Sequence, residues 1–197
     1  MPRIFGDRSR VRERLMSTGK ELFSRYGLKR TSVEEITRKS GVAKGTFYAF
    51  FSSKEQLFFA LLQQEEQFRE DLLTRQYQEA ESAREGIRNI IREGLQFVSE
   101  NELLQQLYQD DTYAALMQKL PEEEIKRHRQ QDEADTRQFI ELLQQQELLI
   151  DCSPEIITGV LRALFLLTLH KREIGEQEFP KIMELLAELL ADGLTTE

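Results

Sequence analysis

The chain has 197 residues, and its 35 Asp and Glu against 27 Lys and Arg give a formal net charge of −8. Its one cysteine, Cys152, excludes an intrachain disulfide and is typical of a protein from a reducing cytoplasm. The N-terminus is polar and lacks a secretory signal, and the longest apolar stretch, residues 156–169, is shorter than the ~20 residues that span a bilayer. We therefore expect a cytoplasmic protein with no membrane partner.

The charge is unevenly distributed along the chain. Residues 1–60 carry 13 Lys and Arg against 6 Asp and Glu, a net charge of +7, whereas residues 61–197 have a net charge of −15. A basic region at one end of an acidic chain is typical of proteins that bind nucleic acid at that end. The alternative is chance clustering of solvated charges.

The first predicted helix covers about residues 8–26, where apolar side chains recur at helical spacing, and Gly27 follows as a suitable C-cap. Five arginines lie before this helix or in its first turns. They form either a basic arm that adds non-specific affinity for DNA or a solvated helix face. They are Arg3, Arg8, Arg10, Arg12 and Arg14.

Residues 32–51 predict two short helices joined by a tight turn. Ser32 is a favourable N-cap, and Glu35 lies three residues later, which is the spacing of a capping box. Gly41 takes the left-handed conformation without a Cβ clash, so the chain can turn sharply there. A second helix over about residues 43–50 completes a helix-turn-helix, whose second helix enters the major groove of DNA.

Periodicity assigns the side chains of these two short helices to a core face and a solvent face. Val33 and Ile36 of the first helix are expected to face the core, and Thr37 is expected to face water. In the second helix, the i, i+4 spacing places Ala43 and Phe47 inward.

The rest of the chain also predicts helices and no persistent strand pattern. The expected ranges are residue 52 or 53 to the high seventies, 83–100, a broken segment over 101–120, 121–146, 154–171 and 176–192. We expect an all-α fold of about nine helices, with an N-terminal DNA-binding domain at residues 1–52 and a C-terminal domain at residues 53–197.

The sequence offers little for catalysis. His128 and His170 are far apart, no His/Cys/Asp cluster has metal-ligand spacing, and no glycine-rich phosphate loop is present. The sequence therefore predicts neither an enzyme nor a metal or cofactor site.

Three ordered segments, ELFSRYGLKRTSVEEI, SGVAKGTFYAFF and SSKEQLF, resemble the DNA-binding region of the TetR/AcrR family of bacterial regulators. The resemblance covers residues 10–60 and implies a three-helix helix-turn-helix head on a larger helical body that binds a ligand and dimerises. It implies a sequence-specific transcriptional regulator, and specifically a repressor that an unknown small-molecule effector releases from a palindromic operator. The alternative is a DNA-bound dimer that acts through a protein partner and has no effector.

The same resemblance implies the residues that contact DNA. They are Ser32, Lys44, Gly45, Thr46, Tyr48 and Lys54. Lys44, Gly45 and Thr46 lie at or near the bases, and Tyr48 and Lys54 hold phosphates. Ser32 shares its hydroxyl between the helix cap and a phosphate. In the structural interpretation, Ser32 is only a cap, and Thr46 and Tyr48 are ordinary surface residues.

The predicted helix over residues 154–171 is apolar on most sides, so it must be covered from two directions, and the last predicted helix adds apolar residues at near-heptad spacing. They form either a core pair within one subunit or half of a four-helix bundle between two copies of the chain. The resemblance favours the homodimer. Its predicted interface contains Ile157, Val160, Leu161, Leu164, Phe165, Phe179, Ile182, Leu186, Leu189 and Leu190.

The resemblance also implies an effector pocket in the body. The candidate lining residues are Phe97, Leu104, Leu107, Tyr108, Tyr113, Met117, Phe139 and Phe165. The two tyrosines offer hydrogen bonds in an otherwise apolar setting. The alternative for each of these residues is a place in the ordinary core.

Overall fold

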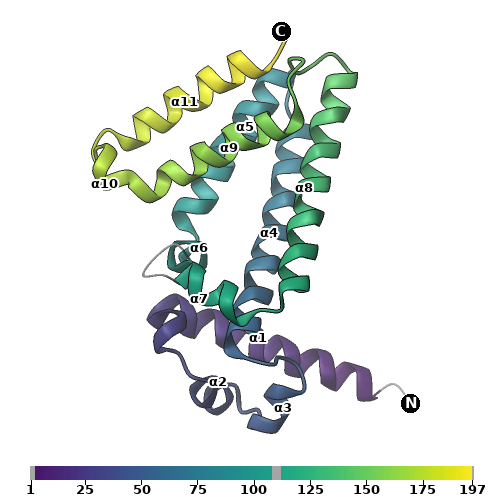
Figure 1. The fold of residues 1–197 in the computed structure, drawn as a ribbon, viewed down its shortest axis with the longest axis vertical. Coiled ribbons are helices and arrows are strands. Elements are labelled where there is room, and N and C mark those ends of the chain that lie inside the picture. Colours follow the sequence, from purple (N-terminus) through teal and green to yellow (C-terminus); the bar gives the residue numbers. More distant parts are fainter. Residues whose placement is uncertain (1–2, 108–111, 197) are drawn as a thin grey trace. The chain divides into compact units, whose positions relative to one another are not determined.

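The computed structural model describes residues 3–107 and 112–196, and the regular elements of the described chain are helices joined by short loops (Figure 1). The elements are α1 Arg3–Arg30, α2 Val33–Ser40, α3 Lys44–Tyr48, α4 Lys54–Gln78, α5 Ala83–Glu100, α6 Glu102–Leu107, α7 Thr112–Lys119, α8 Glu122–Gln145, α9 Pro154–Leu167, the 3-10 helix η1 Thr168–His170, α10 Lys171–Ile174 and α11 Phe179–Leu194. An isolated β-bridge joins Leu149 to Thr195. The predicted all-α fold is confirmed.

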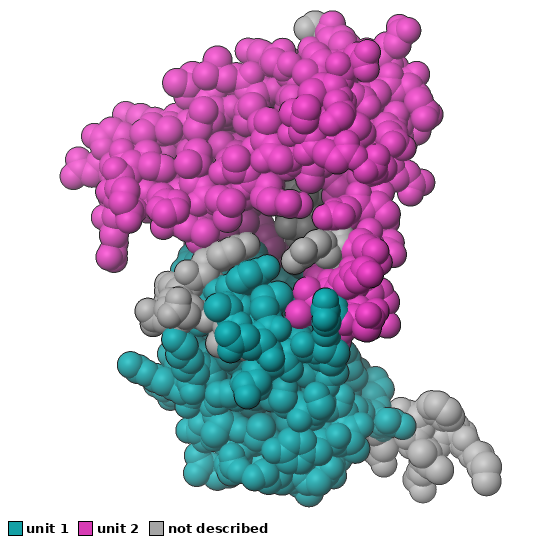
Figure 2. Space-filling view, in the orientation of Figure 1, with its two compact units in different colours: residues 1–66, 102–122 teal, residues 67–101, 123–197 magenta. Residues whose placement is uncertain are grey.

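The chain divides into two compact units (Figure 2). Unit 1 contains residues 1–66 and 102–122, and unit 2 contains residues 67–101 and 123–197. The predicted domain boundary at residue 52 falls inside unit 1. It concerns functional domains, so it stays a prediction.

Unit 1 is built on an aromatic core. The rings of Phe23 from α1 and Phe58 from α4 pack edge to face with their centroids 5.2 Å apart, and both side chains are fully buried. Ile36 of α2 and Phe47 of α3 are also fully buried. Each such side chain contributes about 2 kcal/mol through its burial. Helix α2 packs against α1, and α3 packs against α2.

Gly27 interrupts α1 near its C-terminal end. Its φ of 77° and ψ of 165° lie outside the helical region, and a Cβ there would meet Gln106 Oε1 at 2.8 Å. The predicted helix end at this glycine is therefore a break, after which α1 continues to Arg30. The helix begins at Arg3, which is earlier than the predicted start near residue 8.

Unit 2 packs α5 against α9 and α11 around a core that includes Ile91, Ala187 and Ala191. In Figure 1, η1 and α10 turn the chain between α9 and α11. The predicted helix 154–171 is thus three elements, because Thr168 Oγ1 donates to the Phe165 carbonyl at 2.7 Å where the α-helix ends. None of the described helices combines the length and the apolar composition that crossing a bilayer requires.

An ion-pair ladder joins α5 to α11 on one side of unit 2. Basic side chains recur every four residues on α5, and acidic side chains recur every four residues on α11. The pairs are Arg84 with Asp192 and Glu188 (2.9 Å), Arg88 with Glu188 (3.3 Å), and Arg92 with Glu184 (3.2 Å). This i, i+4 spacing places each set on one face of its helix, so the ladder fixes the register of the two helices.

Candidate nucleic-acid interface

The capping box predicted at the start of α2 is present. Glu35 N–H donates to Ser32 Oγ at 3.2 Å, and Ser32 N–H donates to Glu35 Oε2 at 2.9 Å. The backbone N–H and then the hydroxyl of Ser32 hold the pKa of Glu35 below its ordinary value, because they stabilise the carboxylate. Ser32 therefore has a structural role in the free protein.

The turn between α2 and α3 is fixed by backbone contacts. Gly41 is left-handed, with φ 63° and ψ 32°, as predicted for a helix C-cap. Val42 N–H donates to the Thr37 carbonyl at 3.0 Å. The Arg14 guanidinium donates to the Ser40 carbonyl and occupies the space that a Cβ on Gly41 would need. The conformation of Gly41 and these two hydrogen bonds together fix the angle between α2 and α3.

Two predicted side-chain orientations in this region are wrong. Ala43 is exposed and Val42 is buried, because Ala43 has extended φ and ψ values as the N-cap and precedes the helix. Thr37 is buried, and its hydroxyl donates to the Glu34 carbonyl at 3.1 Å, so it needs no contact with water. The phase of a helix this short is set by its caps more than by its periodicity.

The outer face of α3 carries the side chains that were predicted to read bases. Phe47 is fully buried and anchors the helix, whereas Lys44, Gly45 and Tyr48 are exposed and Thr46 is half-buried. No heavy atom lies within 4 Å of a Cβ placed on Gly45. The backbone of α3 is therefore open to close approach by a ligand.

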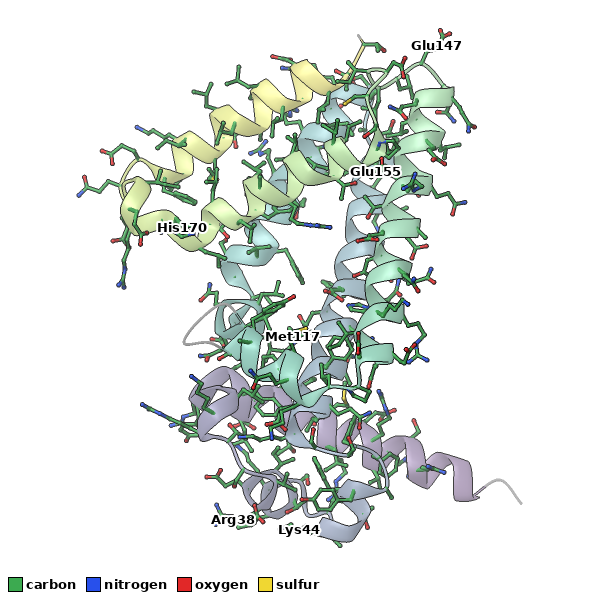
Figure 3. All side chains as sticks on the ribbon, viewed as in Figure 1. Arg38, Lys44, Met117, Glu147, Glu155 and His170 are labelled. Atoms are coloured by element: carbon green, nitrogen blue, oxygen red, sulfur yellow. The ribbon has the colours of Figure 1, made fainter. Side chains whose placement is uncertain are left out.

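Lys44 is paired with an acidic residue of α2 in the free protein. Its ammonium group donates to the Glu34 carboxylate, which raises the pKa of Lys44 and lowers the pKa of Glu34. Figure 3 shows Lys44 of α3 and Arg38 of α2 along the same edge of unit 1. A phosphate or base that binds Lys44 competes with Glu34 for the same protons.

A hollow of about 400 Å³ lies beside these helices within unit 1. Its lining residues are Lys29, Arg30, Thr31, Ser32, Val33, Tyr48, Ser52, Ser53, Lys54 and Glu55. It therefore brings together Ser32, Tyr48 and Lys54, the residues that were assigned to phosphates. Lys29 and Arg30 were missed, although two basic residues just before the capping segment of a DNA-binding helix are a usable signal. Three basic side chains and one carboxylate line the hollow, and this net positive charge favours the binding of an anion there.

Lys54 has a structural role that the sequence did not indicate. Its Nζ donates to the carbonyls of Leu28 at 2.7 Å, Thr31 at 2.8 Å and Lys29 at 3.2 Å. An ammonium group has three N–H donors, and this geometry uses all of them. The first turn of α4 is thereby tied to the end of α1.

The residues predicted to line an effector pocket lie in both units. Leu104, Leu107, Tyr113 and Met117 belong to unit 1; Phe97, Phe139 and Phe165 belong to unit 2; Tyr108 lies outside the described residues. In unit 2, Phe139 packs edge to face with Tyr77 at 5.4 Å, and the Phe165 ring covers Gly94. The assignment of these residues to a pocket stays a prediction.

The residues predicted for a dimer interface differ in exposure. Ile157, Leu164 and Phe179 are buried in the core of unit 2, so they already have partners within their own chain. Val160 and Leu189 are exposed, at 36% and 57%. Further exposed apolar side chains on α9 and α11, which the prediction did not include, are Ile156, Leu166 and Leu185.

Residues 15–61 match the sequence profile described as bacterial regulatory proteins, tetR family. Residues 15–61 are thus similar to the DNA-binding region of the tetR family. The match contains α2, α3 and the first turns of α4, so it coincides with the helix-turn-helix described above. The family description is that of regulators, which are not enzymes, in agreement with the prediction.

A relative within the tetR-type region is the uncharacterized HTH-type transcriptional regulator YvdT of Bacillus subtilis. It is 41% identical over 49 residues, which span 25% of this chain and 25% of that protein. The matched stretch thus covers a quarter of the relative's length.

Two solved structures resemble the whole chain. A tetR-family transcriptional regulator from Pectobacterium atrosepticum is 22% identical, covers 99% of both chains and gives a TM-score of 0.73. A tetR-family regulator from Mesorhizobium loti is 19% identical, covers 96% of this chain and 98% of its own, and gives a TM-score of 0.72. These likenesses show that the tetR fold extends over the full length.

Proposed function

We propose that this protein is a transcriptional regulator that binds duplex DNA through α2 and α3. The observation that carries the proposal is the outer face of α3, where Lys44, Gly45 and Tyr48 are exposed and the space beside Gly45 is open. A helix held in this way by a buried aromatic residue fits the major groove, which admits one α-helix.

Phosphate binding is assigned to the hollow beside α3. Ser32 and Tyr48 offer hydroxyl groups there, and Lys29, Arg30 and Lys54 supply positive charge. Contacts of this kind fix the register of a protein on the duplex, while base contacts select the sequence. Lys54 contributes its charge to this site whether it touches a phosphate or only holds the carbonyls of α1.

The proposed assembly is a homodimer formed through α9 and α11. The support is the set of exposed apolar side chains on these helices, including Ile156, Val160, Leu185 and Leu189. Covering apolar side chains of this size with a second copy removes them from water and stabilises the dimer. Two heads related by a two-fold axis bind a palindrome with half-sites ~34–36 Å apart.

The proposed regulation is repression that a small-molecule effector relieves. Helix α4 is continuous from Lys54 to Gln78, and it contributes residues to both units. A stiff helix of this kind carries a displacement from a ligand in the body to the head, and a coupling of ~1–3 kcal/mol weakens DNA binding about 5- to 150-fold. The effector and the operator are the unknowns of this proposal.

Selection of random duplex DNA by the purified protein at moderate salt, followed by sequencing, tests the proposal. We expect an enriched inverted repeat, and we expect Thr46→Ala and Tyr48→Ala to lose it while the oligomeric state is kept. Retention of DNA without a shared motif contradicts sequence-specific regulation by the head. Operator binding that no small molecule changes, together with capture of a defined protein partner on the body, favours a partner-recruiting dimer.

A further inference from the structure

The N-terminal turns of α1 lie against the chain segment that follows α3. The Arg8 guanidinium carbon is 5.4 Å from the centroid of the Phe50 ring, and that of Arg12 is 5.7 Å from the centroid of Phe51. The two arginines are one helical turn apart, and the two rings come directly after the last turn of α3. A guanidinium at this distance from a ring face is attracted by the ring quadrupole, so both arginines have a defined position.

These stacked arginines keep their hydrogen-bonding capacity. The side chains of Arg8, Arg10 and Arg12 are exposed, and no carboxylate is paired with any of them among the side chains that the structure describes. The nearby acid, Glu13, accepts a hydrogen bond from Ser9 at 2.9 Å. Stacking uses the flat face of a guanidinium and leaves its N–H edge free for an anion.

Arg14 differs from the other arginines of this segment. It donates to the Ser40 carbonyl at the end of α2 and fills the space beside Gly41. The sequence alone leaves all five arginines as either a basic arm or a solvated face. The structure separates Arg14, which belongs to the helix-turn-helix, from Arg8 and Arg12, which are held at the end of α3.

The position next to the end of α3 indicates the partner. Helix α3 has five residues and is about 7.5 Å long, whereas the major groove is about 12 Å wide. When α3 occupies the groove, as proposed above, an element beside the end of so short a helix lies near the groove's edge, where a sugar–phosphate strand runs. Cations placed there meet phosphates and not base edges.

We propose that Arg8 and Arg12, held on Phe50 and Phe51, form a second phosphate-binding site that extends the contact of each head along the DNA backbone. The inference rests on the proposed function and names a separate surface, distinct from the hollow at Ser32, Tyr48 and Lys54. Arg10, exposed on the same turns, adds charge without a fixed position.

The test compares the salt dependence of operator binding for the full-length protein and an Arg8→Gln/Arg12→Gln variant. Each lost phosphate contact lowers the slope of log K against log salt by about 0.9, so the variant loses about 1.8 units of slope and about 30-fold in affinity at 0.15 M salt. Hydroxyl-radical footprinting is expected to lose protection of backbone sugars within each half-site. Arg8→Lys/Arg12→Lys keeps the charge, and we expect it to retain the slope.

Two controls separate this inference from its alternatives. Lys171→Gln/Arg172→Gln removes the same charge from α10 of unit 2 and is expected to leave the slope unchanged. Phe50→Leu keeps both charges and is expected to weaken binding less than the double glutamine variant, with the slope kept. An Arg8→Gln/Arg12→Gln protein that binds more weakly with an unchanged slope overturns the inference, because the arginines then only support α3. If the wild-type chain itself selects no DNA, the proposed function fails first.

Discussion

Lys54 Nζ lies 2.7 Å from the carbonyl oxygen of Leu28, and its other two protons reach the carbonyls of Thr31 and Lys29. Carbonyls at the end of a helix have no partner within the helix, and a cation is favoured there by the helix dipole. Lys54 therefore joins the end of α1 and the residue after it, Thr31, to the first turn of α4. The residue that was predicted to bind phosphate therefore also stabilises the packing of the helices in unit 1.

We expect Lys54→Met to lower the free energy of unfolding by about 2 kcal/mol, since three hydrogen bonds from a charged donor to backbone carbonyls are lost. Urea unfolding followed by circular dichroism measures the change. Lys39→Met, which removes an exposed pair with Glu21, is the matched control and is expected to change stability by under about 1 kcal/mol. Equal stability of the two variants contradicts the structural role. The salt slope of operator binding then decides the phosphate role, because a lost contact lowers the slope by about 0.9.

The capping box at α2 makes a pH-dependent contribution to stability. The folded protein lowers the pKa of Glu35 through the backbone N–H and hydroxyl of Ser32. A lowered folded-state pKa contributes stability that is present above the unfolded-state value, about 4.3, and is lost as the pH falls below it. We expect Ser32→Ala to cost about 1 kcal/mol at neutral pH and to flatten this acid limb. Urea unfolding at pH 7 and pH 3 measures both effects; Ser17→Ala, an exposed serine of α1, is expected to change neither.

Substitution of Gly45 is expected to have opposite effects on protein stability and on DNA binding. A Cβ at this helical position meets nothing within 4 Å, so Gly45→Ala is expected to raise the free energy of unfolding by about 0.5–1 kcal/mol. The same methyl group keeps the α3 backbone from the groove, and we expect about a tenfold loss of operator affinity, as for one lost base contact. Gly193→Ala in α11, which also has open space, should share the first effect and not the second. Unchanged operator affinity in Gly45→Ala removes the close approach from the proposal.

The head was predictable from sequence because its determinants are local. Ser32 with Glu35 and the turn at Gly41 depend on residues within a few positions of one another, and the structure contains both as predicted. Lys54 was assigned by resemblance, yet its carbonyl partners lie 23–26 positions earlier in the chain, and no periodicity relates them. The pairing of Arg8 with Phe50 is of the same long-range kind. Ala43 was placed inward because spacing alone does not show where a five-residue helix begins.

Gly94 of α5 lies against the Phe165 ring. A Cβ there would lie 2.7 Å from Cζ and 2.8 Å from Cε1 of the ring, so Gly94→Ala forces a partly buried aromatic ring to shift. We expect a loss of about 1–3 kcal/mol in the free energy of unfolding, as for other overpacked cores. Gly159→Ala on the exposed side of α9 has open space and is expected to stabilise by about 0.5–1 kcal/mol. Equal unfolding midpoints for the two variants contradict this packing.

The exposed leucines of α11 test the homodimer. Leu185 and Leu189 are one turn apart and are 59% and 57% exposed in the single chain. If a second copy covers them, Leu185→Glu/Leu189→Glu buries two carboxylates in an apolar interface, which costs several kcal/mol per ion. We expect sedimentation equilibrium at micromolar concentration to show a dimer for the wild type and a monomer for the variant, with the helical content kept. Leu142→Glu on α8, a leucine of similar exposure (50%) that was not assigned to the interface, is expected to stay dimeric.

A Leu185→Glu/Leu189→Glu protein that remains dimeric places the contact elsewhere and removes α11 from the interface. A monomeric variant that still binds isolated half-sites, and no longer binds the full palindrome more tightly, shows that the dimer supplies the added affinity.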